Sequence, residues 1–206
     1  RVTVPDITVQ KLLAGRQVPL HAESLAKLDL IFGISYKNPR VWGYYFDERN
    51  GANYTVIGIS APATDPLLAS LLISGRYPEE GERHEVVLGD AVAKNLGLQK
   101  RTHFSLFRPD LSQVALQRVG VFQESANLLT ADLMLMSLED ARDLFAMKNN
   151  EFTDLLVDVA NPGEIATIAS KIADALSNIR FRNIRSRPHF FNYFRQTRRR
   201  HSNAFW

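Results

Sequence analysis

The polar residues that could do chemistry are few and scattered in this 206-residue sequence. The densest group is the run from Glu79 to Glu85, which holds four glutamates, an arginine and a histidine. Carboxylates can hold a hard cation, but a coordination loop needs ligands that are spaced and aimed around the ion. This run is contiguous and mixed in sign. It therefore predicts a solvated loop and no metal site.

Other catalytic patterns are also missing from the sequence. There is no phosphate-binding Walker loop, no dinucleotide-binding glycine pattern and no nucleophile elbow. No cysteine is present, which excludes thiol catalysis and disulfides but leaves the compartment open. We therefore expect a protein that is not an enzyme and that needs no cofactor or metal. The histidines are dispersed without ligand spacing: His21, His84, His103, His189 and His201.

An aromatic run is the remaining candidate for ligand binding. In a strand, alternation puts Trp42, Tyr44 and Phe46 on one face and Tyr45 on the other. Three aromatic rings in a row could form a ligand platform, but burial of that face in the core is the interpretation we favour. Met134 and Met136 are two residues apart, and we expect both in the core.

The positive charge is concentrated at the C-terminal end. From residue 175 to 206 there is no acidic residue and there are eight arginines, whereas residues 1–174 hold 17 basic and 22 acidic residues. The basic end could bind lipid phosphates beside a membrane, bind nucleic acid, or be a solvated charge run. A net-negative body would repel nucleic acid, so we expect none to bind. We assign membrane-proximal roles to Arg195, Arg198, Arg199, Arg200 and Trp206.

The sequence has the marks of a fragment between two membrane spans. It begins with Arg1 rather than methionine, and no apolar stretch reaches the roughly 18 residues that a spanning helix needs. The closing pair Phe205–Trp206 suits a chain that enters a bilayer interface. An arginine cluster on the outer side runs against the usual cytoplasmic location of such charges.

Strands and short helices alternate along the chain. We expect a strand and a helix within residues 1–30. After Asn38–Pro39, a strand over residues 40–46 should form a hairpin with the strand that follows residues 48–51. A short helix at 67–74 and a strand, cap and helix at 85–97 follow, with Asp90 as the cap. Two strands around Pro109–Asp110 come next. A helix capped by Ser137 and a β-α-β unit over 153–184 complete the chain, with an apolar helix stripe at Ile165, Ile168, Ala169, Ile172 and Leu176.

The order of these motifs resembles the extracytoplasmic core domain of MacB/LolC/FtsX-like ABC transporter permeases. The resemblance covers about residues 40–190. It departs from the family at 99–102, where a Gly-Asp turn is usual. It rests on the strand 54–59, Gly75-Arg76-Tyr77, the strand 85–89, Leu96-Gly97-Leu98, Val119-Gly120-Val121-Phe122 and the closing β-α-β unit.

The resemblance implies an α+β fold with two parts. A porter-like β-α-β subdomain would consist of residues 1–74 and 150–194, and a smaller mixed α/β subdomain of residues 75–149 would be inserted in it. Residues 195–206 would form a basic juxtamembrane segment. We expect the domain on the periplasmic or extracytoplasmic face of the inner membrane.

The resemblance also implies a function without catalytic residues. The domain would bind a periplasmic partner or cargo and transmit ATP-driven motion from the membrane helices. Its partners would be a cytoplasmic ATPase subunit acting through the full-length permease, a second permease copy, and a periplasmic adaptor or lipoprotein cargo. The alternative is an extracytoplasmic ligand-sensing domain of a membrane receptor. Efflux, lipoprotein extraction and signalling all remain open.

Overall fold

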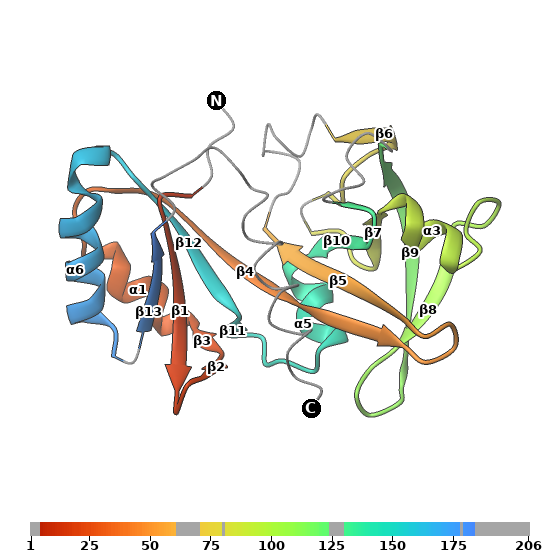
Figure 1. The fold of residues 1–206 in the computed structure, drawn as a ribbon, viewed down its shortest axis with the longest axis horizontal. Coiled ribbons are helices and arrows are strands. Elements are labelled where there is room, and N and C mark those ends of the chain that lie inside the picture. The colour runs from red at the N-terminus through yellow and green to blue at the C-terminus, as the bar shows by residue number, and fades with distance from the viewer. Residues whose placement is uncertain (1–4, 61–70, 80, 124–129, 178, 184–206) are drawn as a thin grey trace, which may run out of the picture.

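The computed structural model describes residues 5–60, 71–79, 81–123, 130–177 and 179–183. Within these ranges one mixed sheet of eleven strands runs the length of the molecule (Figure 1). Beside its main path, β2 (Arg16–Val18) pairs with the first strand and β8 (His103–Phe107) with the ninth. The path itself is β13 (Ile179–Asn183), β1 (Ile7–Leu13), β12 (Asp154–Val159), β4 (Ile34–Asp47), β5 (Ala52–Ile59), β10 (Leu133–Ser137), β7 (Glu85–Leu88), β9 (Gln113–Phe122) and β6 (Leu72–Gly75).

Strand β4 joins the two halves of the sheet. Residues 34–40 pair with β12, and residues 40–47 pair with β5. Because a strand rises by about 3.3 Å per residue, the 14 residues of β4 reach about 43 Å from end to end. We call the part with β13, β1, β12 and the start of β4 the chain-end half. The part with β5, β10, β7, β9, β6 and β8 is the distal half.

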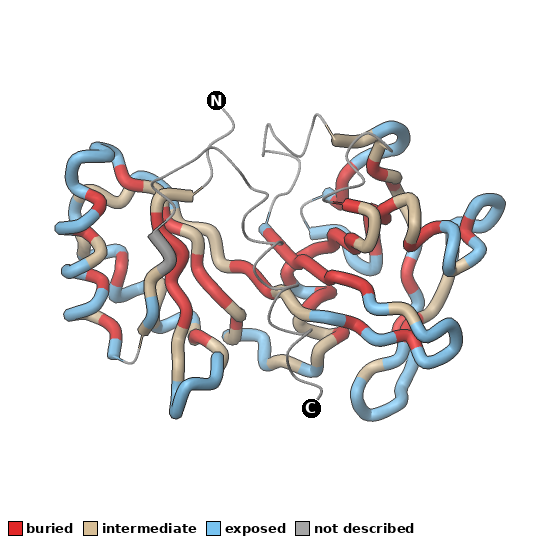
Figure 2. Tube along the Cα trace, viewed as in Figure 1, coloured by how far each residue is buried: buried red, intermediate tan, exposed pale blue. Residues whose placement is uncertain are grey.

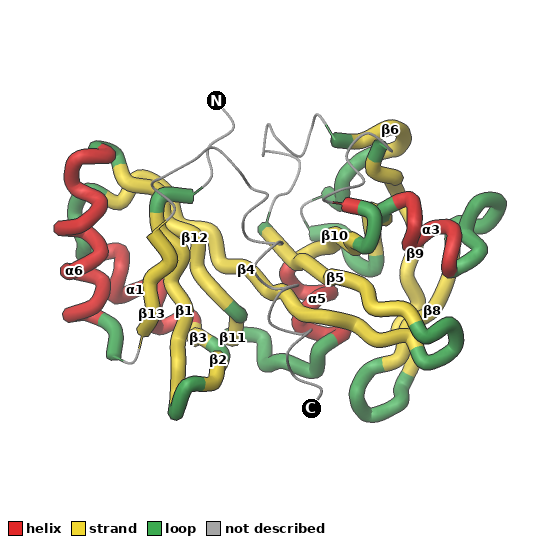
Figure 3. Tube along the Cα trace, viewed as in Figure 1, coloured by secondary structure: helices red, strands yellow, loops and turns green. Residues whose placement is uncertain are grey.

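Figure 3 shows the helices at the chain-end half, beside β4 and β5, and beside β9. Helix α1 (Ala22–Asp29) contacts Lys37, whose ammonium donates to the Leu25 carbonyl. Phe145, just after α5 (Leu138–Leu144), packs against Gly43. Both contacts fall on odd-numbered positions of β4, so α1 and α5 share a face. The other elements are the 3-10 turn η3 (Pro162–Glu164), α6 (Ile165–Ala175), α3 (Asp90–Asn95) and the small sheet of β3 (Leu20–His21) with β11 (Glu151–Phe152).

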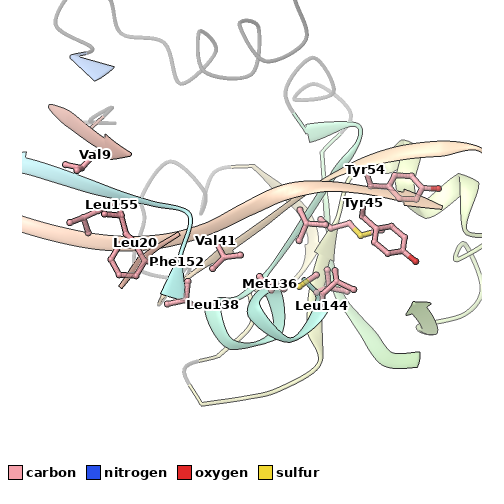
Figure 4. Close-up of a cluster of buried hydrophobic side chains, with 14 of the residues drawn as sticks. Val9, Leu20, Val41, Tyr45, Tyr54, Met136, Leu138, Leu144, Phe152 and Leu155 are labelled. Atoms are coloured by element: carbon pink, nitrogen blue, oxygen red, sulfur yellow. The ribbon is translucent and has the colours of Figure 1, made fainter. Parts of the chain in front are cut away.

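The core runs through both halves (Figures 2 and 4). Figure 4 shows Val9 and Leu155 at one end of the main cluster, Val41 in the middle, and Tyr45 and Tyr54 at the other end. A second, smaller cluster belongs to the distal half and includes Trp42 at its margin. Its buried members are Ile57, Ile59, Tyr77, Val87, Phe122, Leu133 and Leu135. The continuous main cluster makes the two halves one packed body.

Several sequence predictions are confirmed. The hairpin of β4 and β5 turns at Gly51, whose φ of +67° is the conformation that favours glycine. The Ser137 hydroxyl accepts from the Asp140 amide at 3.1 Å, as the predicted cap requires. Met134 and Met136 are fully buried. The α6 stripe is also buried, with Ala169 partly buried beside it.

The elements β12, α6 and β13 form the predicted β-α-β unit, and another strand lies between its two strands. β12 and β13 both pair antiparallel with β1, so they are parallel to each other with β1 in the middle. Sequence order alone could not place β1 there, because the first and last strands are separated by more than 160 residues.

Three local predictions are wrong, and one strand begins earlier than its predicted start at residue 40. Strand β4 continues through Pro39 because the residues before Arg40 pair only with β12 on one side among the described strands, so the missing amide is tolerated. Residues 72–74 are strand β6, paired with β9, rather than helix; residues 67–70 lie outside the described residues. Gly89 occupies the N-cap of α3, and Asp90 is its first helical residue. The aromatic face of β4 is described below.

Candidate functional site

The first notable feature is the side of the chain-end half where the described chain enters and leaves the sheet. We call this side, where several strand ends lie, the edge. Ile7 at the start of β1 lies opposite Asn183 at the end of β13. The same edge holds the end of β12 and the start of β4, where Val159 lies opposite Ile34. Asp6 ties the start of β1 to the end of β12, because its carboxylate accepts from the Val159 amide at 2.9 Å. Both ends of the described chain therefore leave from neighbouring positions on one side of the molecule.

The second feature is a buried polar cluster where β4 passes from β12 to β5. Arg40 donates from Nε to Asp154 Oδ1 at 2.9 Å and from Nη2 to Oδ2 at 2.7 Å. The Trp42 indole donates to the same carboxylate at 3.0 Å. Asp154 is fully buried and Arg40 is 6% exposed. Two parallel bonds to a guanidinium make this a well-oriented charge pair in the interior.

Thr153 ties the same junction through the backbone. Its amide donates to the Arg40 carbonyl at 2.8 Å, and its hydroxyl accepts from the Trp42 amide at 3.1 Å. These bonds act where β12 begins and β5 ends beside β4. The junction between the halves is therefore held by a charge pair, a tryptophan and backbone bonds, rather than by apolar packing alone.

Within the distal half, Asp140 anchors the predicted polar loop. It is 1% exposed, and its carboxylate accepts from Arg83 Nε at 2.6 Å and from the His84 amide at 2.7 Å. The hydrogen bond to Asp140 raises the pKa of Arg83. Glu85, the last residue of the acidic run, is buried and accepts from Arg76 at 2.7 Å. The run thus combines exposed residues with one buried glutamate in an ion pair.

The third feature is the aromatic face of β4, and here the sequence prediction is wrong. Tyr45 is buried, whereas Tyr44 is 38% exposed and Phe46 is 55% exposed. Helices α1 and α5 lie on the odd-numbered face of β4, so the even-numbered aromatics lie on the other side. Trp42 is half-buried and meets Tyr44 edge-on with ring centres 6.2 Å apart. Exposed aromatic side chains therefore extend from the junction toward the hairpin tip.

Polar bonds stiffen the hairpin tip. Asp47 is buried and accepts two side-chain bonds from Arg49, each of 2.9 Å, as well as the Arg49 amide. The Arg49 bond lowers the pKa of the Asp47 carboxyl, although partial burial opposes this shift. The Arg49 guanidinium lies 5.8 Å from the centre of the Phe107 ring, and the Phe107 amide donates to the Tyr45 hydroxyl. The tip of β4 is thus fastened to β8.

The membrane-proximal residues expected from sequence lie outside the described part of the chain: Arg195, Arg198, Arg199, Arg200 and Trp206. Among the described residues, no three His, Asp or Glu side chains gather as metal ligands would. The helices in the described ranges are all too short or too polar to span a bilayer. Sequence reasoning missed the ion pair of Arg40 with Asp154 and the bond from the His84 amide to Asp140. These partners are 114 and 56 residues apart in the sequence. No local pattern signals such pairs.

The fold is that of the extracytoplasmic domains of ABC transporter permeases, as the resemblance predicts. The extracellular domain of the transporter YknZ from Gram-positive bacteria aligns with a TM-score of 0.61 and 13% identity, over 86% of this chain and 99% of that one. The periplasmic region of MacB from Actinobacillus actinomycetemcomitans aligns with a TM-score of 0.59 and 11% identity, over 94% of this chain and 92% of that one. No family model and no curated protein matches the sequence. The predicted α+β class is confirmed.

Proposed function

We propose that this chain is the extracytoplasmic domain of an ABC transporter permease, and that it carries motion from membrane helices to a periplasmic partner or cargo. The observation that carries the proposal is the pairing of Ile7 with Asn183. It places both ends of the described chain on one side of the molecule, where two membrane segments could pull or tilt the domain together. Similarity to YknZ and MacB supports the proposal through the fold.

Stiffness between this edge and the distal half supports the mechanical part. β4 crosses the whole domain without a break and pairs with a neighbour at every position from Tyr36 to Asp47. The buried pair of Arg40 and Asp154 holds the point where the neighbour of β4 changes from β12 to β5. A displacement at the edge would therefore reach the hairpin tip as a rigid-body movement. The motion would originate at a cytoplasmic ATPase, and a second permease copy would carry a matching domain.

We propose the division into residues 1–74 with 150–194 and an inserted part, 75–149, as the family resemblance implies. The strand pairing adds that β5, from the first part, lies beside β10, from the inserted part. The two parts would thus share a sheet instead of meeting at a separate interface. The role itself would be non-enzymatic, and the basic segment 195–206 would lie next to the inner membrane on its outer side.

Partner binding would use the distal half. Tyr44 and Phe46 are exposed on the face of β4 opposite α1 and α5. Aromatic side chains supply much of the contact energy in protein interfaces. A photocrosslinker at position 46 of the full-length permease should capture the periplasmic adaptor or lipoprotein cargo. The same probe at the exposed position Gln117 on β9 should not. Equal capture at both positions would contradict this assignment.

The motion itself can be measured with spin labels. The chain has no cysteine, so a single label at the exposed Ala115 on β9 marks the distal half. In the full-length permease with its ATPase, the distance between the labels of two copies should change on ATP binding. A second sample with labels at Ala115 and Ala166 in one chain should keep one distance, because the sheet is continuous. An unchanged distance between copies during active ATP hydrolysis would refute the proposal.

A further inference from the structure

The turn between α1 and β4 presents two large apolar side chains to solvent. Leu30 is 87% exposed and Phe32 is 93% exposed, the two highest values among the large apolar residues that the structure describes. Ile31 lies between them and packs against the main core. We call Leu30 and Phe32 the apolar tip. Single exposed leucines are common on protein surfaces, but two neighbours exposed to this degree call for an explanation.

The surrounding structure fixes the tip in this outward position. The Ile31 amide donates to the Leu28 carbonyl at 3.0 Å, and the Ala160 amide donates to the Gly33 carbonyl at 2.9 Å. Gly33 has a φ of +101°, and a β-carbon there would lie 2.9 Å from the Ile168 side chain. Because the backbone is held on both sides and Ile31 is packed against the core, Leu30 and Phe32 cannot turn inward together.

The tip lies at the edge of the sheet from which both chain ends depart. Gly33 directly precedes β4, whose first residue, Ile34, lies opposite Val159. Val159 in turn is bonded to Asp6, next to the pairing of Ile7 with Asn183. Strand register therefore places the tip, the entry of β1 and the exit of β13 on one side of the chain-end half. If that side faces the membrane, the tip faces it too.

We propose that the apolar tip inserts into the interfacial layer of the lipid bilayer and gives the domain a third contact with the membrane, besides its two chain ends. This inference rests on the proposed function, which sets the side that faces the membrane. An apolar pair on a rigid turn is well suited to the boundary between headgroups and acyl chains. Beside the tip, Asp29 is ion-paired with Lys37 and the Glu164 carboxylate lies against Gly33, so these charges give no attraction to anionic lipids. We therefore commit to contact by apolar burial in a zwitterionic bilayer.

The test uses the full-length permease reconstituted in phosphatidylcholine vesicles. An environment-sensitive fluorophore is attached to a single cysteine at position 32, where nearly complete exposure makes the substitution safe for folding. We expect a blue-shifted emission and a loss of intensity when lipids with nitroxides on the acyl chains are added. Leu111, exposed by 79% in the turn between β8 and β9, is the matched control and should show neither change.

A third label separates this inference from the proposed function. Asn161 is exposed and polar and lies on the same edge, next to η3. A label there should respond to a headgroup quencher without being reached by the acyl-chain nitroxides. If position 161 responds and position 32 is not quenched, the inference fails while the proposed orientation stands. If neither position senses lipid, the orientation fails as well. A blue shift at position 32 without lipid quenching would mean that protein covers the tip, which also overturns the inference.

Discussion

Arg40 and Asp154 form a buried ion pair with bonds of 2.9 and 2.7 Å at the residue of β4 where its neighbour changes from β12 to β5. Arg40 lies opposite Asp154 on one side and opposite Ile59 on the other. The two halves of the sheet therefore meet at a buried charge pair. The mechanical role proposed for the domain makes this pair the first target for mutation.

Removal of one partner of the pair should destabilise the domain strongly. We expect Asp154→Asn to lower the free energy of unfolding by about 3–5 kcal/mol, because the buried guanidinium loses its counter-charge. Urea denaturation of the 206-residue chain measures this. The matched control replaces both partners, as Arg40→Met with Asp154→Leu, and should recover much of the loss. A single variant within about 1 kcal/mol of the wild type would show that the pair does not hold the junction.

The contribution of the hairpin tip to the free energy of unfolding should depend weakly on pH. The Asp47 pKa is lowered by its bonds to Arg49, so the ionised form stabilises the fold at neutral pH. That contribution is complete above the unfolded pKa of about 3.9, and it is lost as the pH falls through the lower folded pKa. Since Arg49 is half-exposed, we expect Asp47→Asn to cost only about 1 kcal/mol at neutral pH.

The measurement for Asp47 is a series of urea titrations of wild type and variant from about pH 6 to about pH 3. The stability difference should shrink at the acidic end. Arg49→Gln serves as the companion variant, because it removes the two side-chain bonds while it keeps the carboxyl group and its bond from the residue 49 amide. A difference that grows as the pH falls would contradict the assignment.

Close packing of α5 on β5 should make Gly58 intolerant of a side chain. A β-carbon at this position would lie 2.3 Å from the Ala141 β-carbon and 3.0 Å from the Ser137 carbonyl oxygen. We expect Gly58→Ala to cost about 1–3 kcal/mol, since the helix must shift away from the strand. A thermal or urea unfolding curve gives the value.

Ala141→Gly provides a test of the mechanism at Gly58. It removes the nearer of the two contacts, so the added alanine should cost less in this background than in the wild type. A double-mutant cycle then yields a favourable coupling energy between the two positions. If the two changes in free energy were strictly additive, the cost of Gly58→Ala would not arise from its contact with Ala141.

Loss of the N-cap of α5 should have a smaller effect on stability. The Ser137 hydroxyl accepts from the Asp140 amide, so Ser137→Ala should cost about 1 kcal/mol, whereas Ser137→Asp should retain most of the stability. Asp140 also holds Arg83 and the His84 amide. Hydrogen exchange at His84 reports on the loop, and it should rise in Ser137→Ala if the start of α5 positions Asp140. Unchanged exchange would separate the cap from the loop.

The amino-acid sequence by itself determined the local elements whose signals are short-range. Alternation and turn chemistry located the hairpin around Gly51, the capping serine located the start of α5, and the apolar stripe located α6. The ordered motifs also predicted the permease fold that solved structures share. The local elements could be predicted because each depends on residues within a few positions of one another.

The tertiary structure alone decided the features that bear on function. Alternation correctly separated Tyr45 from Tyr44 and Phe46, but only the position of the helices shows which face of β4 is buried. The pairing of Arg40 with Asp154 spans 114 residues, and the pairing of Ile7 with Asn183 spans nearly the whole described chain. Such contacts arise from how the strands order themselves in the sheet. That order is set by the packing of the whole core, which no local sequence pattern encodes.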